Sequence, residues 1–252
     1  MFMRLVQIEI EPEGLHLLQK VYTERVLTAL ADVIGCRFAG LMQSIHHPDT
    51  CLSLTLWKSR SDAEQYERSG LFSQLLEESK PFFSDSTEYS ITLSENLQVE
   101  YVPVRSDPVV KSYPIAAQSE AARAGGEAPR AVWLRIVSLK IRPGKAEEFK
   151  KLYREHSIPA LRAAPGCRFM YLLESGEGRD EVFSITIWDS REHAAEYERS
   201  GVFEKLLGIQ KQTLSGLAQW KMPSDGKDVH KSMTTDDILV EHYTILTGKS
   251  FI

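Results

Sequence analysis

The sequence predicts an α+β fold in which two ferredoxin-like βαββαβ domains of one chain form an intramolecular pseudo-dimeric α/β barrel. Three observations lead to this prediction: an internal repeat, the order of elements within each copy, and a sheet face left without helices. In the repeat, GCRFAGLMQS at Gly35 returns as GCRFMYLLES at Gly166. The same offset relates residues 4–84 to residues 135–215 without a gap, and 32 of the 81 aligned pairs are identical. A repeat of this length indicates a domain duplication, because solenoid repeats run about 20–50 residues.

The front half of each copy is predicted as strand, helix, strand. RLVQIEI at residues 4–10 and LRIVSLKI at residues 134–141 are the first strands. Pro12 follows the first of these and suits the opening turn of a helix, in which apolar residues recur at helical spacing as far as about residue 31. A loop then ends at Gly35, and CRFAGLMQS forms the next strand.

The back half is predicted as strand, helix, strand. In CLSLTLW, alternation places three leucines on one face and Ser53, Thr55 and Trp57 on the other. Ser59 is a suitable N-cap for the second helix, and Gly70 suits its C-terminal end. The last strand is expected at LQVEYVPV in the first copy and at ILVEHYTI in the second.

This element order is the ferredoxin-like unit, with an antiparallel sheet and both helices on one face. The opposite face is bare, so two such units facing each other would form a barrel. The expected domains are residues 1–105 and 131–252, joined by a linker at residues 106–130 that is rich in Ala, Pro, Ser and Gly. The second copy carries extra residues in the loop around SDGKDVHKS.

Composition excludes several classes of protein. The 252 residues are 42% hydrophobic, which is enough to build a core and excludes a fully disordered chain. No apolar run approaches the roughly 18 residues of a membrane-spanning helix, and we expect no signal peptide. The net charge of −5 does not favour a nucleic-acid partner. The three cysteines give no disulfide framework, so we expect a cytoplasmic protein.

A family resemblance is carried by TLWKSRSDAEQYERSGLF and TIWDSREHAAEYERSGVF, each downstream of GCRF. These segments resemble the antibiotic biosynthesis monooxygenase family of dimeric α/β barrels, and the resemblance covers both repeats. Its branches include cofactor-free quinone-forming monooxygenases, haem-degrading monooxygenases and members of no known activity. The quinone-forming branch has an Asn four residues before the strand Trp, where this chain has Ser53 and Ser184.

The haem-degrading branch uses an Asn on the first strand, a Trp on the second helix and a His ten residues further on. The positions that resemble these three are, in the two copies, Gln7 and Ser138, Tyr66 and Tyr197, and Leu76 and Leu207. Leucine cannot ligate iron, so haem degradation is not expected. The chain also lacks CxxC, HExxH, P-loop and GxGxxG motifs, so no metal or nucleotide cofactor is expected.

The candidate site follows from the resemblance and from the strand alternation. The candidate catalytic residues are Trp57, Trp188, Tyr66 and Tyr197. The candidate substrate-binding residues are Ser53, Thr55, Ser184, Thr186, Arg37 and Arg168. The arginines, together with Arg4 and Arg135, would bind an anionic oxygen or pair with acidic residues. The tryptophans would form a pocket wall or pack inside the barrel, and Tyr22 and Tyr153 are expected in the core.

Two functions are consistent with these features. The first is a cofactor-independent monooxygenase that acts on a small aromatic or phenolic substrate, which transfers an electron directly to O2. The alternative is a non-catalytic small-molecule-binding or stress-associated barrel, which the lack of a clear general base favours. The expected partner is a small aromatic molecule, without nucleic acid or membrane, and a further homo-oligomer of the internal pseudo-dimer is possible.

Overall fold

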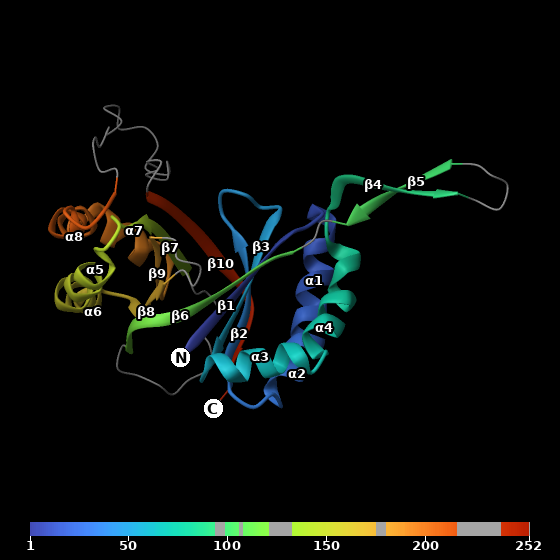
Figure 1. Cartoon of the computed structure of the whole chain (residues 1–252), viewed down its shortest axis with the longest axis horizontal. Coiled ribbons are helices and arrows are strands. Elements are labelled where there is room, and N and C mark those ends of the chain that lie inside the picture. Colours follow the sequence, from blue (N-terminus) through green and yellow to red (C-terminus); the bar gives the residue numbers. More distant parts are fainter. Residues whose placement is uncertain (94–98, 106–107, 121–132, 175–179, 216–237, 252) are drawn as a thin grey trace. The chain divides into compact units, whose positions relative to one another are not determined.

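The computed structural model describes residues 1–93, 99–105, 108–120, 133–174, 180–215 and 238–251 (Figure 1). They form two compact units, the first made of Met1–Ser112 and Leu246–Ile252 and the second of Tyr113–Ile245. The loop around SDGKDVHKS and most of the GEGRD hairpin lie outside the described residues, as do residues 121–130 of the expected linker.

The first unit contains three antiparallel strands that follow each other in the sheet. β1 (Phe2–Glu9) pairs with β3 (Thr50–Trp57), and β3 pairs on its other side with β2 (Cys36–Ser44). The strands coincide with the alternating segments of the sequence. The last residues of the chain also belong to this unit, where the Phe251 N–H donates to the Arg37 carbonyl at 2.8 Å.

The helices of the first unit pack on one face of this sheet. The first helix consists of α1 (Leu15–Val21) and α2 (Leu27–Ala31), joined by a π-helical segment at Tyr22–Val26. It is followed later by α3 (Arg60–Arg68) and α4 (Leu71–Ser79). Short 3₁₀ turns lie at Pro12–Gly14 and Lys80–Phe82. The sequence predicted the first helix and α3. The π-helical segment has no local sequence signal and is a feature often found near functional sites.

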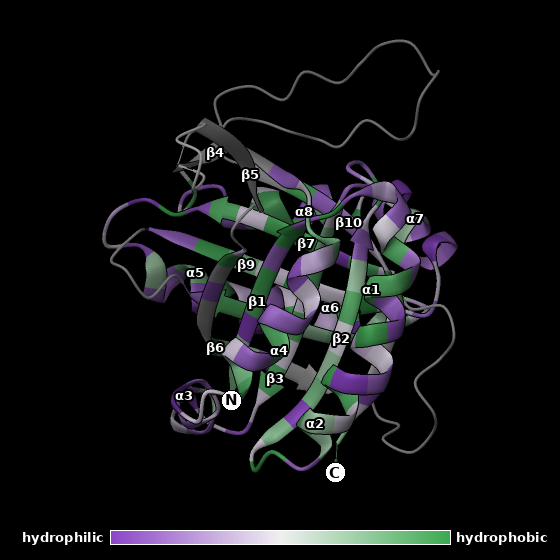
Figure 2. Ribbon diagram, turned by 90° about the vertical axis from the view of Figure 1, so that its right-hand side faces the viewer, coloured by the Kyte–Doolittle hydropathy of each residue, from purple (hydrophilic) through white to green (hydrophobic). Residues whose placement is uncertain are grey.

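The predicted helix ends are confirmed. The Ser59 hydroxyl accepts a hydrogen bond from the Asp62 backbone N–H at 3.2 Å, as an N-cap does. Gly70 has a φ of +80° and separates α3 from α4, so the chain turns there at little steric cost. α3 is mostly hydrophilic along its length, and only Ala63 and Tyr66 are buried (Figure 2).

The second unit repeats this arrangement. Its strands are β7 (Trp133–Lys140), β8 (Cys167–Glu174) and β9 (Glu181–Trp188). Its helices are α5 (Ala146–Leu152), a π-helical segment at Tyr153–Ser157, α6 (Ile158–Ala163), α7 (Arg191–Arg199) and α8 (Val202–Gln210). β10 (Ile238–Ser250) pairs with β7 through Ile238–Thr244, which confirms the last strand expected in the second copy.

The last strand of the first copy was predicted wrongly. β5 (Val99–Arg105) pairs with β4 (Asp85–Leu93) in a separate two-stranded sheet. The barrel strand is β6 (Val109–Glu120), inside the segment whose composition indicated a linker, and it pairs with β8. Its hydrogen-bonding partner determines this conformation and overrides the weak local pattern of alanine, serine and proline.

The eight long strands are hydrogen-bonded in the order β1-β3-β2-β10-β7-β9-β8-β6, and this order closes on itself. The expected fold class, two ferredoxin-like halves forming an α/β barrel, is therefore confirmed. Each unit has its own core between sheet and helices, where Trp57 and Trp188 are completely buried. Among the described residues, no helix combines the length and apolar character needed to cross a membrane.

Candidate functional site

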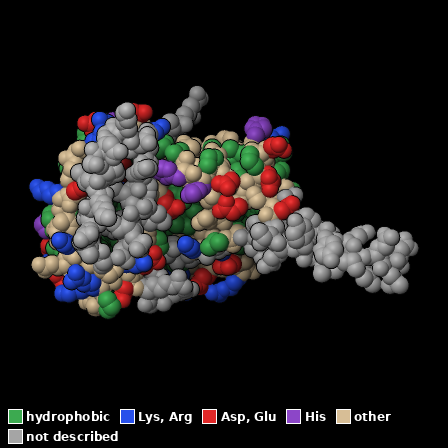
Figure 3. Space-filling model, turned by 90° about the horizontal axis from the view of Figure 1, so that it is seen from above, with side chains coloured by type: hydrophobic (Ala, Val, Ile, Leu, Met, Phe, Trp, Pro, Cys, Tyr) green, Lys and Arg blue, Asp and Glu red, His purple; other side chains and the backbone are tan. Residues whose placement is uncertain are grey.

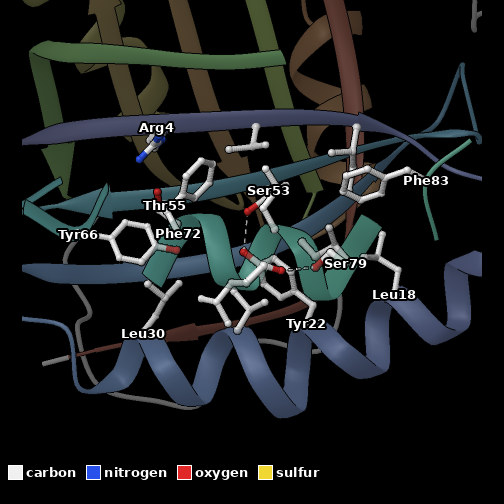
Figure 4. Close-up of a pocket in the computed structure, with 16 residues that line it drawn as sticks. Arg4, Leu18, Tyr22, Leu30, Ser53, Thr55, Tyr66, Phe72, Ser79 and Phe83 are labelled. Atoms are coloured by element: carbon white, nitrogen blue, oxygen red, sulfur yellow. Dashed lines mark hydrogen bonds between the residues drawn. The ribbon is translucent and has the colours of Figure 1, made fainter. Parts of the chain in front are cut away.

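A cavity of about 60 Å³ lies in the first unit between the sheet and the helices (Figure 4). Its walls come from β1, β2, β3, the first helix with its π-helical segment, α3 and α4. Most lining residues are aliphatic or phenylalanine. The polar side chains in the lining are Arg4, Tyr22, Ser53, Thr55, Tyr66 and Ser79. A mainly apolar cavity with a few convergent polar groups is the usual form of a small-molecule site.

The strand alternation predicted which side chains of β3 line this cavity. In the β1–β3 register, Arg4 lies opposite Thr55 and Val6 lies opposite Ser53, so these residues share one sheet face. All four line the cavity, and Figure 4 shows Arg4 near Thr55, Phe72 and Tyr66 at one end of it. The predicted placement of Ser53 and Thr55 beside a cavity is therefore what the structure has.

Two of the predicted hydroxyl groups already have partners. The Tyr22 hydroxyl and the Ser53 hydroxyl are hydrogen-bonded at 2.8 Å, which places the π-helical segment against β3 (Figure 4). The Thr55 hydroxyl accepts from the Trp57 indole N–H at 2.9 Å. Tyr66 lines the cavity, and within the described part of the chain its hydroxyl makes no hydrogen bond.

Trp57 lies behind the cavity wall. Its indole N–H is used by Thr55, its side chain is fully buried, and its ring stacks on Tyr66 with centroids 5.1 Å apart. The cavity lining does not include it. Trp57 therefore does not reach the cavity, whereas Tyr66, on whose ring it stacks, does.

Arg4 has a more prominent place in the cavity than the sequence analysis indicated. Its side chain is 4% exposed, its Nη2 pairs with the Glu67 carboxylate at 3.1 Å, and its guanidinium lies 4.1 Å from the centre of the Phe72 ring. Its buried Nε has no hydrogen-bond partner. A buried cation at the end of β1 can be inferred from the sequence, since Arg4 stands among apolar residues of a predicted strand, but its open N–H can only be seen in the structure.

The arginines chosen from the sequence lie elsewhere. Arg37 is exposed and lies where the β2–β3 register shifts between Cys36 and Phe38, so simple alternation does not hold there. Arg168, its counterpart, is ion-paired through Nε with the Asp189 carboxylate. Neither arginine lines a cavity, so the predicted substrate-binding role has no geometric support.

The second unit has a matching but smaller cavity of about 30 Å³. Ser184, Thr186 and Tyr197 line it as predicted, and the Tyr153 hydroxyl is hydrogen-bonded to the Ser184 hydroxyl at 2.9 Å. Trp188 is again behind the lining and donates to Thr186 at 2.9 Å.

Several polar groups near the cavities stay protonated at neutral pH. Burial raises the pKa of the Tyr22, Tyr66 and Tyr197 hydroxyls, and it raises the pKa of Tyr153 to about 12. Burial also raises the pKa of the Cys36, Cys51 and Cys167 thiols to about 12. The tyrosine hydroxyls and the cysteine thiols therefore keep their protons at neutral pH, and none of these groups is a base.

The cavity linings do not suit a haem iron. Leu76 and Leu207 line the two cavities where a ligand histidine would be needed, and neither lining contains His, Cys, Asp or Glu. Gln7, matched to the strand Asn, lies on the other sheet face, because its neighbours Val6 and Ile8 line the cavity. Across the described residues, no group of three metal-binding side chains is found.

Fold and site together define a duplicated α/β-barrel protein with a small, mainly apolar cavity between sheet and helices in each half. The chain belongs to the antibiotic biosynthesis monooxygenase family, whose sequence model matches residues 1–78 and 134–207. The two matched segments confirm the tandem duplication. No curated protein matches the chain.

Solved structures agree with this fold. A proposed monooxygenase from Lactobacillus acidophilus has a TM-score of 0.67 at 8% identity, covering 99% of this chain and 95% of its own. A proposed monooxygenase from Fusobacterium nucleatum has a TM-score of 0.67 at 6% identity, covering 99% and 94%. An anthrone oxidase-like protein has a TM-score of 0.57 at 14% identity, covering 99% and 92%. At these identities the similarity shows the fold alone.

Proposed function

We propose that the chain is a cofactor-independent monooxygenase that oxidises a small aromatic or phenolic substrate in the cavity of the first unit. Family membership supports a monooxygenase-like function. The observation that carries the proposal is the composition of this cavity, in which apolar walls surround the Tyr66 hydroxyl and the Arg4 guanidinium. Such walls accept a flat ring, and the two donors suit an oxygen that gains negative charge.

In the proposed reaction the substrate supplies all the electrons. An enolate or phenolate with an adjacent CH2 group attacks O2 through carbon and forms a C–O bond to a peroxide. Loss of water from the peroxide leaves a carbonyl, so that CH2 and O2 become C=O and H2O. O2 takes four electrons from the substrate, and no cofactor is required. The protein holds the anion, keeps water away from it and orients the ring.

The size of the cavity restricts the substrate. A cavity that binds benzene measures about 150 Å³, which is more than the 60 Å³ seen in the first unit. A ring therefore enters only when side chains of α4 move. Phe72 and Leu76 on this helix are half-buried and line the cavity, so a change of their rotamers opens it at moderate cost.

A second candidate function is a non-catalytic binding protein. It is favoured by the absence of Asp, Glu and His from the cavity lining, since no side chain there can take the substrate proton. In the monooxygenase proposal that proton leaves to water before the ring is enclosed, which requires an acidic substrate. Substrates that ionise readily should therefore react faster than weakly acidic ones.

Oxygen uptake with a panel of phenols, quinols and anthrone-type compounds tests the proposal. We expect uptake with at least one acidic aromatic compound, with one carbonyl product per O2 consumed. Tyr66→Phe should reduce the rate about tenfold, because it removes one donor to the developing anion. Tyr197→Phe, the matched change in the second unit, controls for loss of stability. Ring binding without any uptake would favour the non-catalytic function.

A further inference from the structure

We infer that the two repeats have divided their roles: the first binds an anionic aromatic ligand through the open Nε–H of Arg4, whereas the second is sealed by its own side chains. The inference rests on the proposed ligand site and adds the charge of the ligand and the number of sites. The repeats are 131 residues apart, so every side chain that lines the first cavity has a known counterpart in the second repeat.

The first repeat presents an unsatisfied cation to its cavity. Arg4 is 4% exposed, and its Nε–H is buried without a partner. Leaving a buried donor unpaired is destabilising, and such a group in a folded protein calls for an explanation. Its ion-pair partner Glu67 is 56% exposed and therefore screened by water. An oxyanion in the cavity would satisfy the Nε–H and add charge pairing.

In the second repeat the equivalent arginine is fully engaged. Arg135 donates from Nε to the Glu198 carboxylate at 2.7 Å. The same carboxylate oxygen lies 3.1 Å from the His242 Nε2. His242 comes from β10, so the second unit adds a residue to this cluster from its last strand. The Arg135 Nε is thus used by the protein itself and offers no bond to a ligand.

Three substitutions also distinguish the surroundings of the two cavities. Leu18 of the first repeat corresponds to Phe149, which is larger and completely buried. Ser79 corresponds to Gln210, and Val26 corresponds to Ser157. Gln210 and Ser157 are hydrogen-bonded across the end of the second cavity, from Nε2 to Oγ at 2.8 Å, and both are 3% exposed. This pair has no counterpart in the first repeat, and the first cavity is about twice as large.

Binding of 4-nitrophenol tests the inference, with nitrobenzene as the neutral ring of similar shape. Calorimetry should give one 4-nitrophenolate per chain, and the visible phenolate band of the bound dye should persist to lower pH than that of the free dye. Arg4→Gln should weaken phenolate binding by about tenfold to a hundredfold, and Arg135→Gln should change it less than twofold. The double variant Val26→Ser, Ser79→Gln installs the sealing pair of the second repeat and should weaken binding of both rings.

The outcomes separate the two proposals. A stoichiometry of two, an Arg4→Gln variant that binds like the wild type, or an equal loss in Arg135→Gln would overturn the division of roles. Equal affinity for nitrobenzene, unaffected by Arg4→Gln, would overturn the anion site and leave the cavity as a neutral ligand site. If neither ring binds and no oxygen uptake is found, both proposals fail. Should Arg4→Gln not fold, the wild-type stoichiometry and Arg4→Lys, which keeps the charge, still decide the matter.

Discussion

At the scale of single residues, the cavity is organised by hydroxyl pairs that connect helix and sheet. Tyr22 and Ser53 form one pair, and Tyr153 and Ser184 form the other. Strand alternation predicted that Ser53 lies on the sheet face opposite the leucines. The tyrosines were predicted as core residues, and they are buried at 4% and 3% exposure. The hydrogen bond between tyrosine and serine could not be predicted from the sequence, because it depends on how the π-helical segment orients each tyrosine toward the sheet.

The Tyr22–Ser53 pair makes a testable contribution to stability. Ser53→Ala leaves the buried Tyr22 hydroxyl without its partner, so the free energy of unfolding should fall by about 1–3 kcal/mol. The double variant Tyr22→Phe, Ser53→Ala should recover most of this loss, since removing both partners is nearly neutral. Urea denaturation measures both values. A double variant that is less stable than Ser53→Ala would contradict this explanation.

Glu198 gives the second unit a dependence on pH. Burial alone would raise the pKa of this carboxyl, but the hydrogen bond with His242 and the charge of Arg135 outweigh it and lower the pKa to about 2 from an ordinary 4.5. A folded-state pKa below the unfolded one stabilises the protein at pH values above 4.5, and this stabilisation is lost as the pH falls from about 5 to 2.

Thermal unfolding as a function of pH tests this contribution. The wild type should lose stability steeply below pH 5, and Glu198→Gln should remove part of that slope while lowering the melting temperature at pH 7. Glu67→Gln is the matched variant in the first unit. Because Glu67 is 56% exposed, its effect at pH 7 should be smaller. Parallel profiles for the wild type and Glu198→Gln would refute the role given to this carboxylate.

At the scale of elements, the sequence is most informative where one residue type satisfies a local requirement. Ser59 caps α3, and Gly70 ends it with a positive φ, as predicted. The sequence is least informative where the conformation of a segment depends on its pairing with another strand. β6 was hidden in a segment typical of a linker, because its strand conformation depends on pairing with β8. Likewise, the register shift between Cys36 and Phe38 at the start of β2, where the exposed Arg37 lies, has no counterpart in the alternating sequence pattern.

Two glycines of the first unit allow the cost of a positive φ to be separated from the cost of a steric overlap. At Gly70 an added Cβ would meet nothing within 4 Å, so Gly70→Ala suffers only from the positive φ and should cost about 1 kcal/mol. Gly35 also has a positive φ, and an added Cβ there would overlap the Asp62 side chain. Gly35→Ala should therefore destabilise the protein clearly more than Gly70→Ala in chemical denaturation. Equal losses would mean that Asp62 moves aside freely.

At the scale of the whole molecule, duplication has freed one copy from the constraint of binding. The repeats kept the residues that build the sheet-to-helix contacts, such as Trp57 and Trp188, and these are the ones that the sequence identified most easily. They differ at the far end of the cavity, where Ser79 corresponds to Gln210. The sequence could show this difference but not its meaning, since only the structure places Gln210 inside a cavity. On the face in view in Figure 3, the described acidic, basic and apolar side chains are interspersed.

The chain's last residues complete the first unit, although they follow the second repeat in the sequence. The Leu246 carbonyl accepts from the Gln19 side chain at 2.8 Å, the Thr23 hydroxyl donates to the Thr247 hydroxyl at 3.0 Å, and the Phe251 N–H donates to the Arg37 carbonyl. Gln19 lies in α1, one turn before the π-helical segment, and Thr23 lies within that segment. Their contacts with the last residues therefore hold the part of the first helix that forms a wall of the first cavity.

Truncation after Ile245 should therefore damage the first unit more than the second. We expect the shortened chain to bind 4-nitrophenolate at least tenfold more weakly, because Gln19 and Thr23 lose their partners and Tyr22 loses its fixed position. It should also self-associate, since the edge of β2 is then unpaired. Truncation after Ser250 removes the Phe251 hydrogen bond and the packing of Phe251 against the first core, and serves as the milder control. Calorimetry and size-exclusion chromatography measure the two effects, and full ligand affinity in a monomeric chain ending at Ile245 would show that the first unit forms without its last strand.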